Sequence, residues 1–490
     1  MKTIPIPFIV PLAAVFLSVC VARGTERPEG SGPDQQGKSN GTVETRLFVD
    51  DVELAKRENV VRRAHACAKP AEPILIPEKP WEQDGEDRRI YVYGTVLRDP
   101  ATGQFRMWYN RLDRILYATS EDGLMWRRPE LGLVEHEGSA ENNLLPIDMH
   151  SPSVVFDPDA ENADARYKML GHPRKAPRGY CVAHSADGLK WTFYPKNPLA
   201  PGGDTCTLAH DADTGEFFAF FKKTHEHRGH RRRLVYLSTS RDMQTWTEPV
   251  LVMAPDEIDD AQTAAQGGKF SQFYNMSAFR HGNQWLGLVT HFRYSGSPPR
   301  KGPLQSGDDG PIDVQLVHSR DGLDWKRCED RSPVIPNGPH DYDAGCILGT
   351  ANLPVFVGDE MWIYYTAITT THGGFVPEKV ITIALAKWRR DGFVSLEAGE
   401  EEGVVETVPI KSGGRSLRIN ADAEGGRLLV ELLHPRTGEP LDGYSAADAV
   451  PITTDSVAHE VRWQNGSALP SNVFQIRFRL KNTRLYSYAL

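Results

Sequence analysis

The stretch His-Ser-Ala-Asp-Gly-Leu-Lys-Trp at residues 184–191 is one of four copies of a short motif, S-x-D-[G/M]-x-x-W. The other copies lie at residues 119–126, 239–246 and 318–325, and a shortened fifth copy lies at 389–393. Successive aspartates of the motif are 65, 55, 79 and 70 residues apart. A motif that returns at such intervals indicates one supersecondary unit that is used five times.

The residue types of this motif suit a tight turn between two strands. Ser and Asp side chains accept hydrogen bonds from backbone amides two residues on, and glycine adopts a positive φ without a Cβ clash. The tryptophan then gives each unit a large apolar surface to bury against a neighbour. We therefore assign the repeated aspartates to structure and not to catalysis; they are Asp122, Asp187, Asp242, Asp321 and Asp391.

The sequence around the motif is repeated as well. A short run rich in aromatic and aliphatic residues precedes each copy, at 104–109, 167–171, 216–221, 284–289 and 360–365. A strand, a polar turn, an aromatic strand and the strand that ends in the motif make a meander, which is typical of a β-propeller blade. Five such units between about residues 88 and 395 predict an all-β protein built on a five-bladed β-propeller.

The repeat stops after Ser395, and a different pattern takes over. Apolar and polar residues alternate at 417–421 and at 474–480, with glycine turns between these runs. Alternation with a period of two predicts half-buried antiparallel strands, here forming a C-terminal β-sandwich. The predicted organisation is a signal peptide at 1–22, a disordered linker at 23–45, the propeller at 46–395 and the sandwich at 396–490.

The N-terminus is typical of an export signal. Lys2 is followed by an apolar run at 4–21 that three prolines interrupt, and Cys20-Val21-Ala22 is similar to a small-residue cleavage site. A membrane anchor is the alternative, but the run is short and interrupted by proline. We expect a secreted or periplasmic protein with no integral membrane segment once the signal is removed.

Composition argues against several classes of partner. The net charge of −9 gives no support for a nucleic-acid partner. The basic stretch at 225–233 is expected to be a solvated loop, although its histidines are residues that can bind a transition metal. The cysteines show no C-x-x-C spacing, so no metal site is predicted. No cofactor is predicted either, although a Ca²⁺ ion in the central channel is compatible with the sequence.

The order of these parts resembles secreted bacterial proteins of the five-bladed glycoside hydrolase type, and the nearest named relatives are the family 32 and family 43 glycosidases. The first unit contributes Leu47-Phe48-Val49-Asp50-Asp51, Pro80-Trp81-Glu82 and Tyr93-Gly94-Thr95-Val96 to the likeness. The W-M-N-D-P-N-G motif of the β-fructosidases is absent, and Arg98-Asp99-Pro100 lies at a hairpin turn. The resemblance implies a carbohydrate substrate, but fructan hydrolysis is not supported.

Glycoside hydrolysis needs two carboxyl groups, one protonated and one ionised. The inner strands of a propeller point their first residues into one central funnel, so acids that precede these strands are the candidates. We expect Asp204, Asp343 and Glu82 to be catalytic and to share one water-accessible pocket. Aromatic and hydrogen-bonding side chains usually complete a sugar site, and the candidates here are Trp81, Tyr93, His150, Tyr274, Asn275 and His372.

Three functions stay open from the sequence. The first is a secreted glycoside hydrolase that uses the funnel carboxylates. The second is a non-catalytic carbohydrate-binding propeller. The third is a sialidase-like enzyme, because the repeated motif approaches the Asp-box S-x-D-x-G-x-x-W, although it lacks one residue of it.

Overall fold

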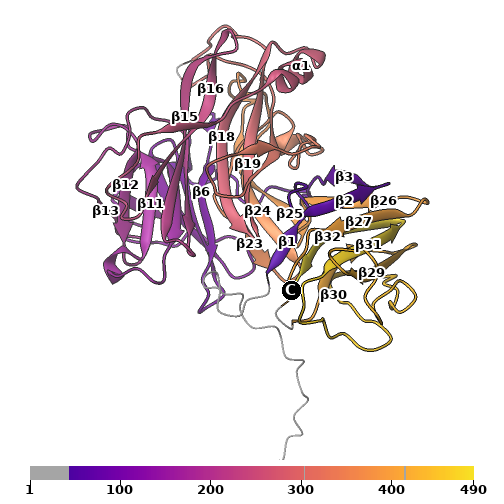
Figure 1. Ribbon diagram of the computed structural model, residues 1–490. Helices are drawn as coiled ribbons and strands as arrows, with labels where there is room; N and C mark the ends of the chain where they lie inside the picture. The colour runs from indigo at the N-terminus through magenta and orange to yellow at the C-terminus, as the bar shows by residue number, and fades with distance from the viewer. Residues whose placement is uncertain (1–43, 303, 413–414) are drawn as a thin grey trace, which may run out of the picture. The chain divides into compact units, whose positions relative to one another are not determined.

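The computed structural model describes residues 44–302, 304–412 and 415–490, and this part of the chain is nearly all β (Figure 1). Its helical content is α1 (Glu257–Ala265) and the 3-10 helices η1 (Pro80–Glu82), η2 (Ala163–Ala165) and η3 (Asp341–Asp343). The predicted all-β class is confirmed. The predicted signal peptide and nearly all of the predicted linker lie outside the described residues.

Three four-stranded antiparallel sheets follow one another along the chain, each a meander in sequence order. The first sheet contains β6 (Tyr91–Arg98), β7 (Phe105–Arg111), β8 (Arg114–Ser120) and β9 (Leu144–Asp148). The second contains β10 (His150–Phe156), β11 (Tyr167–His172), β12 (Cys181–Ser185) and β13 (Thr192–Phe193). The third contains β14 (Cys206–Asp211), β15 (Glu216–His227), β16 (His230–Ser240) and β17 (Val250–Met253).

A larger sheet comes next, and it consists of two meanders joined by one parallel residue pair, Ile312 with Cys346. Its first half contains β18 (Phe270–His281), β19 (Gln284–Tyr294), β20 (Ile312–Ser319) and β21 (Lys326–Arg327). Its second half contains β22 (Cys346–Thr350), β23 (Val355–Val357), β24 (Glu360–Ile368) and β25 (Ile381–Arg389). A separate two-stranded sheet, β4 (Gln83–Asp84) with β5 (Asp87–Arg88), precedes β6.

The first strands of these five meanders contact one another in a closed ring, in the order β6, β10, β14, β18, β22 and back to β6. Side-chain hydroxyls join neighbouring strands of the ring. Thr95 Oγ1 donates to Val154 O at 2.9 Å, Ser151 Oγ to Cys206 O at 2.8 Å, and Thr205 Oγ1 to Tyr274 O at 3.2 Å. Small hydroxyl residues suit this position, because backbones that approach closely leave little room for larger side chains.

The ring has two different ends. In the third meander, Cys206 at the start of β14 pairs with Phe221, whereas the motif residue Ser240 pairs with Phe217 at the other end. We call the end where β6, β10, β14, β18 and β22 begin the mouth end, and the end that carries the repeated turns the turn end. Asp204 therefore belongs to the mouth end, and the motif aspartates belong to the turn end.

The four complete turns share the hydrogen bonds of their serine and aspartate side chains. At residues 185–191, Ser185 Oγ accepts from the backbone N–H of Gly188 at 2.9 Å, and Asp187 Oδ1 accepts from Leu189 N and Lys190 N at 2.8 and 2.9 Å. Trp191 Nε1 donates to Gly188 O at 3.1 Å. The equivalent serine and aspartate bonds recur at Asp122, Asp242 and Asp321. These three motif aspartates and Asp187 are therefore structural, as predicted.

The fifth, shortened copy differs from the other four. Asp391 is buried, and its carboxylate binds His281 Nε2 and Ser487 Oγ, both at 2.6 Å. Ser487 belongs to β32 near the C-terminus, so this aspartate connects two sheets instead of closing its own turn. The prediction of a structural aspartate is correct here, but the expected turn contacts are not.

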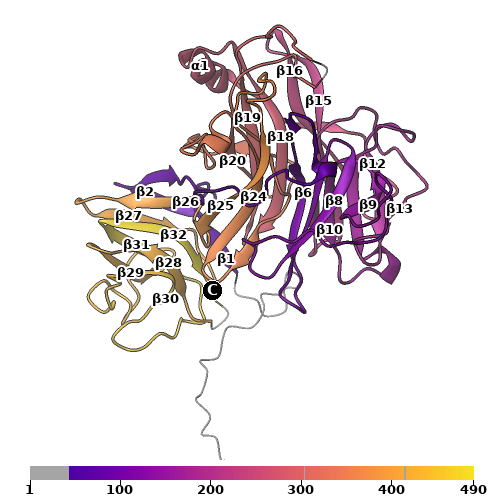
Figure 2. The same cartoon turned by 180° about the vertical axis from the view of Figure 1, so that it is seen from behind.

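The C-terminal strands form two sheets around one hydrophobic core that contains Leu396, Val405, Phe478 and Tyr488. One sheet contains β3 (Val61–Ala64), β26 (Val394–Ala398), β32 (Thr483–Ala489), β28 (Arg418–Asp422) and β30 (Asp455–Glu460), with β1 (Thr45–Leu47) on β32. The other contains β2 (Leu54–Glu58), β27 (Gly403–Thr407), β31 (Gln475–Lys481) and β29 (Arg427–Leu433), as the reverse view also shows (Figure 2).

This pairing changes one predicted boundary. Residues 45–64 were expected to open the domain at 46–395, but β1, β2 and β3 pair with strands that follow residue 393. Period-two alternation in a short N-terminal strand does not reveal its partner, because backbone pairing is the same with any edge.

Two further local predictions are corrected. Helix α1 was not expected, yet Asp256 caps it by accepting from Ile258 N and Asp259 N at 3.0 Å. The basic stretch at 225–233 is not a loop, because β15 and β16 pair as far as His227 with His230.

All five cysteines of the described part are free. No helix in the described residues is long and apolar enough to cross a membrane.

Candidate functional site

Asp204 is the predicted acid that stays accessible to water. It directly precedes β14 at the mouth end, and its side chain is 35% exposed. Its Oδ2 forms an ion pair with Nζ of Lys222, which lies on β15. Its Oδ1 lies 3.6 Å from Nε2 of His150, the first residue of β10. A lysine and a histidine from two different sheets therefore converge on one carboxylate.

Aromatic rings contact both partners of this carboxylate, His150 and Lys222. Tyr91 and Tyr93 of β6 stack with their ring centroids 5.2 Å apart, and His150 meets the Tyr93 ring edge-on at 5.3 Å. On the other side, Nζ of Lys222 lies 4.0 Å from the ring centroid of Tyr274. The ring of His372 lies 5.1 Å from that of Tyr274. We call this group the Asp204 cluster, consisting of Asp204, His150, Lys222, Tyr91, Tyr93, Tyr274 and His372.

Electrostatics hold Asp204 in its charged form. Burial alone raises the pKa of its carboxyl group, but Lys222 and His150 outweigh that effect and bring the pKa well below its ordinary value. Burial lowers the pKa of Lys222, and the charge of Asp204 offsets this only in part. Asp204 is therefore ionised at neutral pH and can accept a proton or stabilise a positive charge.

His372 is a buried histidine that lies near three cations. Burial is the main cause that lowers the pKa of this imidazole to about 3, and the cations Lys379, Arg233 and Lys222 contribute to the same shift. Its Nδ1 lies 2.9 Å from Asp308 O. His372 is therefore a neutral hydrogen-bonding group at neutral pH, in a region of positive potential.

Glu82 is not in this cluster, and the expectation that it lines a water-accessible pocket is wrong. Its side chain is 0% exposed. Arg128 donates to both of its oxygens, at 2.7 and 3.0 Å, and Tyr109 OH donates to Oε1 at 2.6 Å. The backbone N–H groups of Glu78 and Lys79 both donate to Oε2 at 3.1 Å. A carboxylate with five donors has no free lone pair for a substrate.

Asp343 is also separate from the Asp204 cluster, and its expected exposure is likewise wrong. Its side chain is 0% exposed, and its Oδ2 accepts from Lys69 Nζ at 2.6 Å and from Tyr365 OH at 2.7 Å. Lys69 also donates to the carbonyl oxygens of Pro336 and Gly338. The acid thus anchors an N-terminal segment to the segment that precedes β22.

The predicted sugar-binding residues divide between two places. Tyr93, His150, Tyr274 and His372 meet in the Asp204 cluster. Asn275 follows Tyr274 on β18 and is buried beside Tyr93 at Gly349, and its Nδ2 has no hydrogen-bond partner among the described residues. Trp81 lies elsewhere, because its Nε1 donates to Asn143 at 2.7 Å and it packs on the core around Phe105.

The sequence did not reveal several residues of the site. Lys222 and Tyr91 were missed, and so was Arg233, whose guanidinium lies 5.3 Å from the ring centroid of Tyr274. Arg233 is paired with Asp308 at 2.7 Å. One usable signal existed, because Lys222 is the first charged residue after the aromatic run at 217–221.

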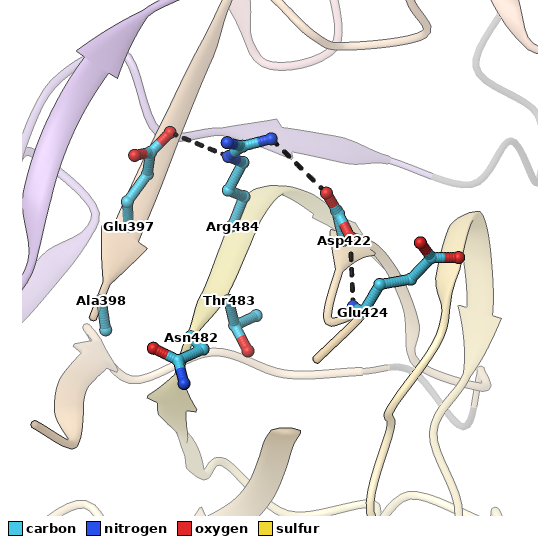
Figure 3. A pocket seen from close by; sticks show the side chains of 7 residues that line it. All are labelled: Glu397, Ala398, Asp422, Glu424, Asn482, Thr483 and Arg484. Carbon is cyan, nitrogen blue, oxygen red and sulfur yellow. Dashed lines mark hydrogen bonds and ion pairs between the residues drawn. The ribbon is translucent and has the colours of Figure 1, made fainter. Parts of the chain in front are cut away.

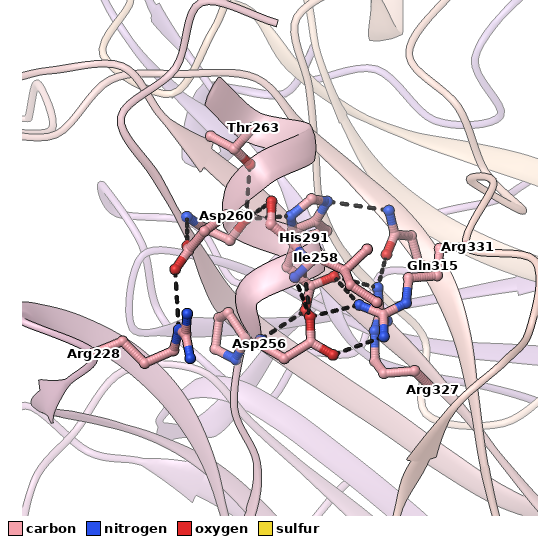
Figure 4. A network of polar contacts seen from close by, with 12 residues as sticks. Arg228, Asp256, Ile258, Asp260, Thr263, His291, Gln315, Arg327 and Arg331 are labelled. Atoms are coloured by element: carbon pink, nitrogen blue, oxygen red, sulfur yellow. Dashed lines mark hydrogen bonds and ion pairs between the residues drawn. The ribbon is translucent and has the colours of Figure 1, made fainter. Parts of the chain in front are cut away.

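Two acids that precede β18, Asp259 and Asp260, belong to a different network (Figure 4). Asp259 is 0% exposed and binds Arg327 at 2.9 Å and Arg331 at 3.0 Å. Asp260 binds Arg232 at 2.6 Å. These pairs fix α1 to β16, to β21 and to the segment that follows β21, so we assign them to structure.

A polar pocket of about 270 Å³ lies on the C-terminal sheets and not at the Asp204 cluster (Figure 3). Arg484 lies between two of its acids, 3.4 Å from Glu397 and 3.5 Å from Asp422. No aromatic side chain lines it, so it lacks a platform for a sugar ring. Within the described residues, no group of three or more His, Cys, Asp or Glu side chains could hold a metal ion.

Comparisons with known proteins give structural likenesses only, because no family model and no curated protein matches the sequence. A thermostable family-43 glycoside hydrolase is 14% identical, with a TM-score of 0.44, over 63% of this chain and 93% of that one. The Bombyx mori family-32 β-fructofuranosidase is 11% identical, with a TM-score of 0.39, over 85% and 93%. The Podospora anserina α-L-arabinofuranosidase is 11% identical, with a TM-score of 0.39, over 65% and 96%.

The predicted resemblance to family 32 and 43 glycosidases is thus confirmed among solved structures. Identities this low assign no activity, so the function has to be sought in the side chains of the site.

Proposed function

We propose that the chain is a five-bladed β-propeller followed by a C-terminal β-sandwich. The closed ring of β6, β10, β14, β18 and β22 supports five blades, since each of these strands opens its own meander. The single parallel pair between Ile312 and Cys346 is too little to make one blade of the fourth and fifth meanders. The shared core of the two C-terminal sheets supports the sandwich.

We propose that this propeller is a secreted or periplasmic glycoside hydrolase and that the Asp204 cluster is its active site. The observation that carries the proposal is the ionised, part-exposed carboxylate of Asp204 between aromatic rings at the mouth end. An ionised carboxylate supplies the base or the nucleophile that glycoside hydrolysis needs, and the tyrosines, which are 2–7% exposed, form the wall behind it.

The role of each residue follows from its surroundings. Asp204 is too acidic to donate a proton, so it acts on water or on the anomeric carbon, or stabilises the positive charge that develops there. Lys222 and His150 keep it ionised and orient it. A second group must protonate the leaving oxygen, and this role stays unassigned, because Glu82 and Asp343 are fully buried and Asp308 is ion-paired with Arg233.

The decisive variant is Asp204→Asn, which keeps the shape of the side chain and removes its charge. After a substrate is found by screening aryl-glycosides and polysaccharides, kcat should fall by about 10²–10⁴-fold. The matched control is Asp213→Asn, an exposed aspartate at the turn end of the same sheet, which should leave kcat unchanged. Unchanged turnover in Asp204→Asn would refute the assignment.

A non-catalytic carbohydrate-binding protein is the second candidate. It is favoured by the burial of Glu82 and Asp343, which leaves Asp204 as the single accessible member of the predicted catalytic set. In that case calorimetry would detect binding of a glycan from the substrate panel, but no hydrolysis product would form. Asp204→Asn would then change the affinity for that glycan and nothing else. The sialidase-like alternative rests on the repeated motif, whose polar side chains are engaged in turn contacts in the four complete copies.

A further inference from the structure

A strongly basic hairpin extends from the site. Residues 222–233, which we call the basic hairpin, contain one acid, Glu226, and six cations, although the whole chain has a net charge of −9. The cations are Lys222, Lys223, Arg228, Arg231, Arg232 and Arg233. Positive charge is therefore concentrated in a segment of a protein that is otherwise acidic.

Both ends of this hairpin belong to the site. Lys222 pairs with Asp204, and both Lys222 and Arg233 lie over the ring of Tyr274, at 4.0 and 5.3 Å. Between them the backbone pairing is continuous, from Lys222 with Val235 to His227 with His230. Figure 1 shows β15 and β16 as two long strands that extend together towards the end of the molecule that carries α1. The hairpin is thus an ordered extension of the mouth and not a loose loop.

Several cations of the hairpin are already neutralised. Arg232 is buried and bound to Asp260, Arg228 shares that acid, and Arg233 is paired with Asp308. These pairs hold the hairpin in place against α1.

Two other cations of the hairpin lack such a pairing. Lys223 is half-buried over the rings of Phe221 and Tyr236, and Arg231 is exposed opposite Glu226. No carboxylate of the described residues lies within ion-pair distance of Lys223 or Arg231. Their charges are therefore available to a ligand.

The other side of the mouth adds to this positive charge. Lys379 is 6% exposed, and its Nζ donates to His372 O at 2.6 Å, with no carboxylate of the described residues within ion-pair distance. The lowered pKa of His372, to about 3, reflects its burial and the nearby charges of Lys379, Arg233 and Lys222. A buried lysine without a counter-ion has a strong preference for an anionic neighbour.

We propose that the glycan bound at the Asp204 cluster is anionic and that its carboxylate or sulfate groups lie along the basic hairpin. The inference rests on the proposed carbohydrate site and specifies its substrate class. Lysine and arginine side chains bind carboxylate and sulfate through charge-assisted hydrogen bonds. Strand alternation puts Arg231 on the face of the hairpin that carries Lys222 and Arg233, and Lys223 on the opposite face, so a chain that enters the mouth would pass Arg231 directly. A charged group near His372 would meet Lys379. A nucleic acid is disfavoured, because the mouth contains the ionised Asp204 and the chain as a whole is acidic.

The test compares two ligands that differ only in charge. Calorimetry of the full chain with tetragalacturonic acid and with its neutral methyl ester, at 50 mM NaCl, should show at least about tenfold tighter binding of the acid. The preference should shrink at 500 mM NaCl because salt screens exposed charges. A sulfated galactose tetrasaccharide, run in parallel, distinguishes sulfate from carboxylate recognition.

The double variant Lys223→Gln/Arg231→Gln should lose about fivefold or more in affinity for the acid and little for the ester. The matched control is Lys190→Gln/Lys196→Gln, which removes two exposed lysines, one within the second turn and one just after it, and should keep the preference. Equal affinities of the acid and the ester would overturn the inference and leave the proposed function intact. Binding of neither kind of glycan would overturn both, and tighter binding of duplex DNA would assign the hairpin to nucleic acid.

Discussion

Asp204 and Asp187 are both aspartates at an end of a sheet, but they lie at opposite ends of the ring and have different kinds of partner. Asp187 at the turn end accepts from its neighbours Leu189 and Lys190 in the chain. Asp204 at the mouth end is bound by Lys222 and His150, which come from other strands of two sheets. Local, neutral partners hold Asp187 in its turn, whereas charged partners from other strands hold Asp204 in a place that only the tertiary structure defines.

The buried acids give a third kind of environment. Glu82 and Asp343 are paired with cations, as Asp204 is, but they are completely shielded from water. The difference teaches that a cationic partner alone does not make a functional acid, since a structural ion pair has the same chemistry. Access for a substrate separates the two cases.

The largest effect is expected at the turn end. Trp325 is 7% exposed and packs edge-on against Phe220 at 5.7 Å, so Trp325→Ala should lower the free energy of unfolding by about 4 kcal/mol. Trp191 is only half-buried, and Trp191→Ala should cost about half as much. Urea denaturation of both variants measures the difference. Equal losses would mean that burial does not decide the contribution of the repeated tryptophan.

A buried acid should affect stability more than turnover. Glu82→Gln leaves the charge of Arg128 less compensated, and we expect a loss of about 3 kcal/mol in the free energy of unfolding. Glu78→Gln is the control, because Glu78 pairs with the same arginine at 2.8 Å but is 53% exposed, and it should cost less than about 1 kcal/mol. If Glu82→Gln instead kept full stability and lost turnover, Glu82 would belong to the active site after all.

The mouth end should show a pH dependence that the turn end lacks. The folded protein keeps His372 neutral down to a pKa of about 3, whereas an unfolded histidine takes up a proton near pH 6.5. Stability should therefore fall as pH drops from 6.5 towards 3.

Between pH 6.5 and 5, His372→Asn should reduce that fall by about 2 kcal/mol, as measured by urea denaturation at several pH values. His291, with a pKa lowered to about 4 by burial, contributes a similar loss and remains in the variant. An unchanged pH profile in His372→Asn would show that this histidine is not kept neutral by its surroundings.

The smallest effect is expected when Asp187 receives the same substitution as Asp204. Asp187→Asn keeps an oxygen that can accept from Leu189 N and Lys190 N, so it should cost about 0.5–1 kcal/mol of stability. Turnover should not change. A kcat loss in Asp187→Asn equal to that in Asp204→Asn would remove the distinction between the two ends.

The sequence by itself determined the all-β class, the four repeated turns and the structural role of the aspartates in those four turns. These features depend on residues close together in the chain, and their hydrogen bonds form within three residues. The position of Asp204 directly before β14 could also be inferred, because an acid that precedes an apolar strand leaves a recognisable local pattern.

Only the tertiary structure decided which acids share a pocket. Asp204, Asp343 and Glu82 have the same local pattern, but their partners Lys222, Lys69 and Arg128 lie 18, 274 and 46 residues away. The tertiary structure also places β1, β2 and β3 in the C-terminal sheets. It shows, too, that the basic stretch continues β15 and β16 beyond the mouth end of the ring. Ion pairs and strand pairing are made across space, and their energy depends on burial, which the order of residues in one chain does not encode locally.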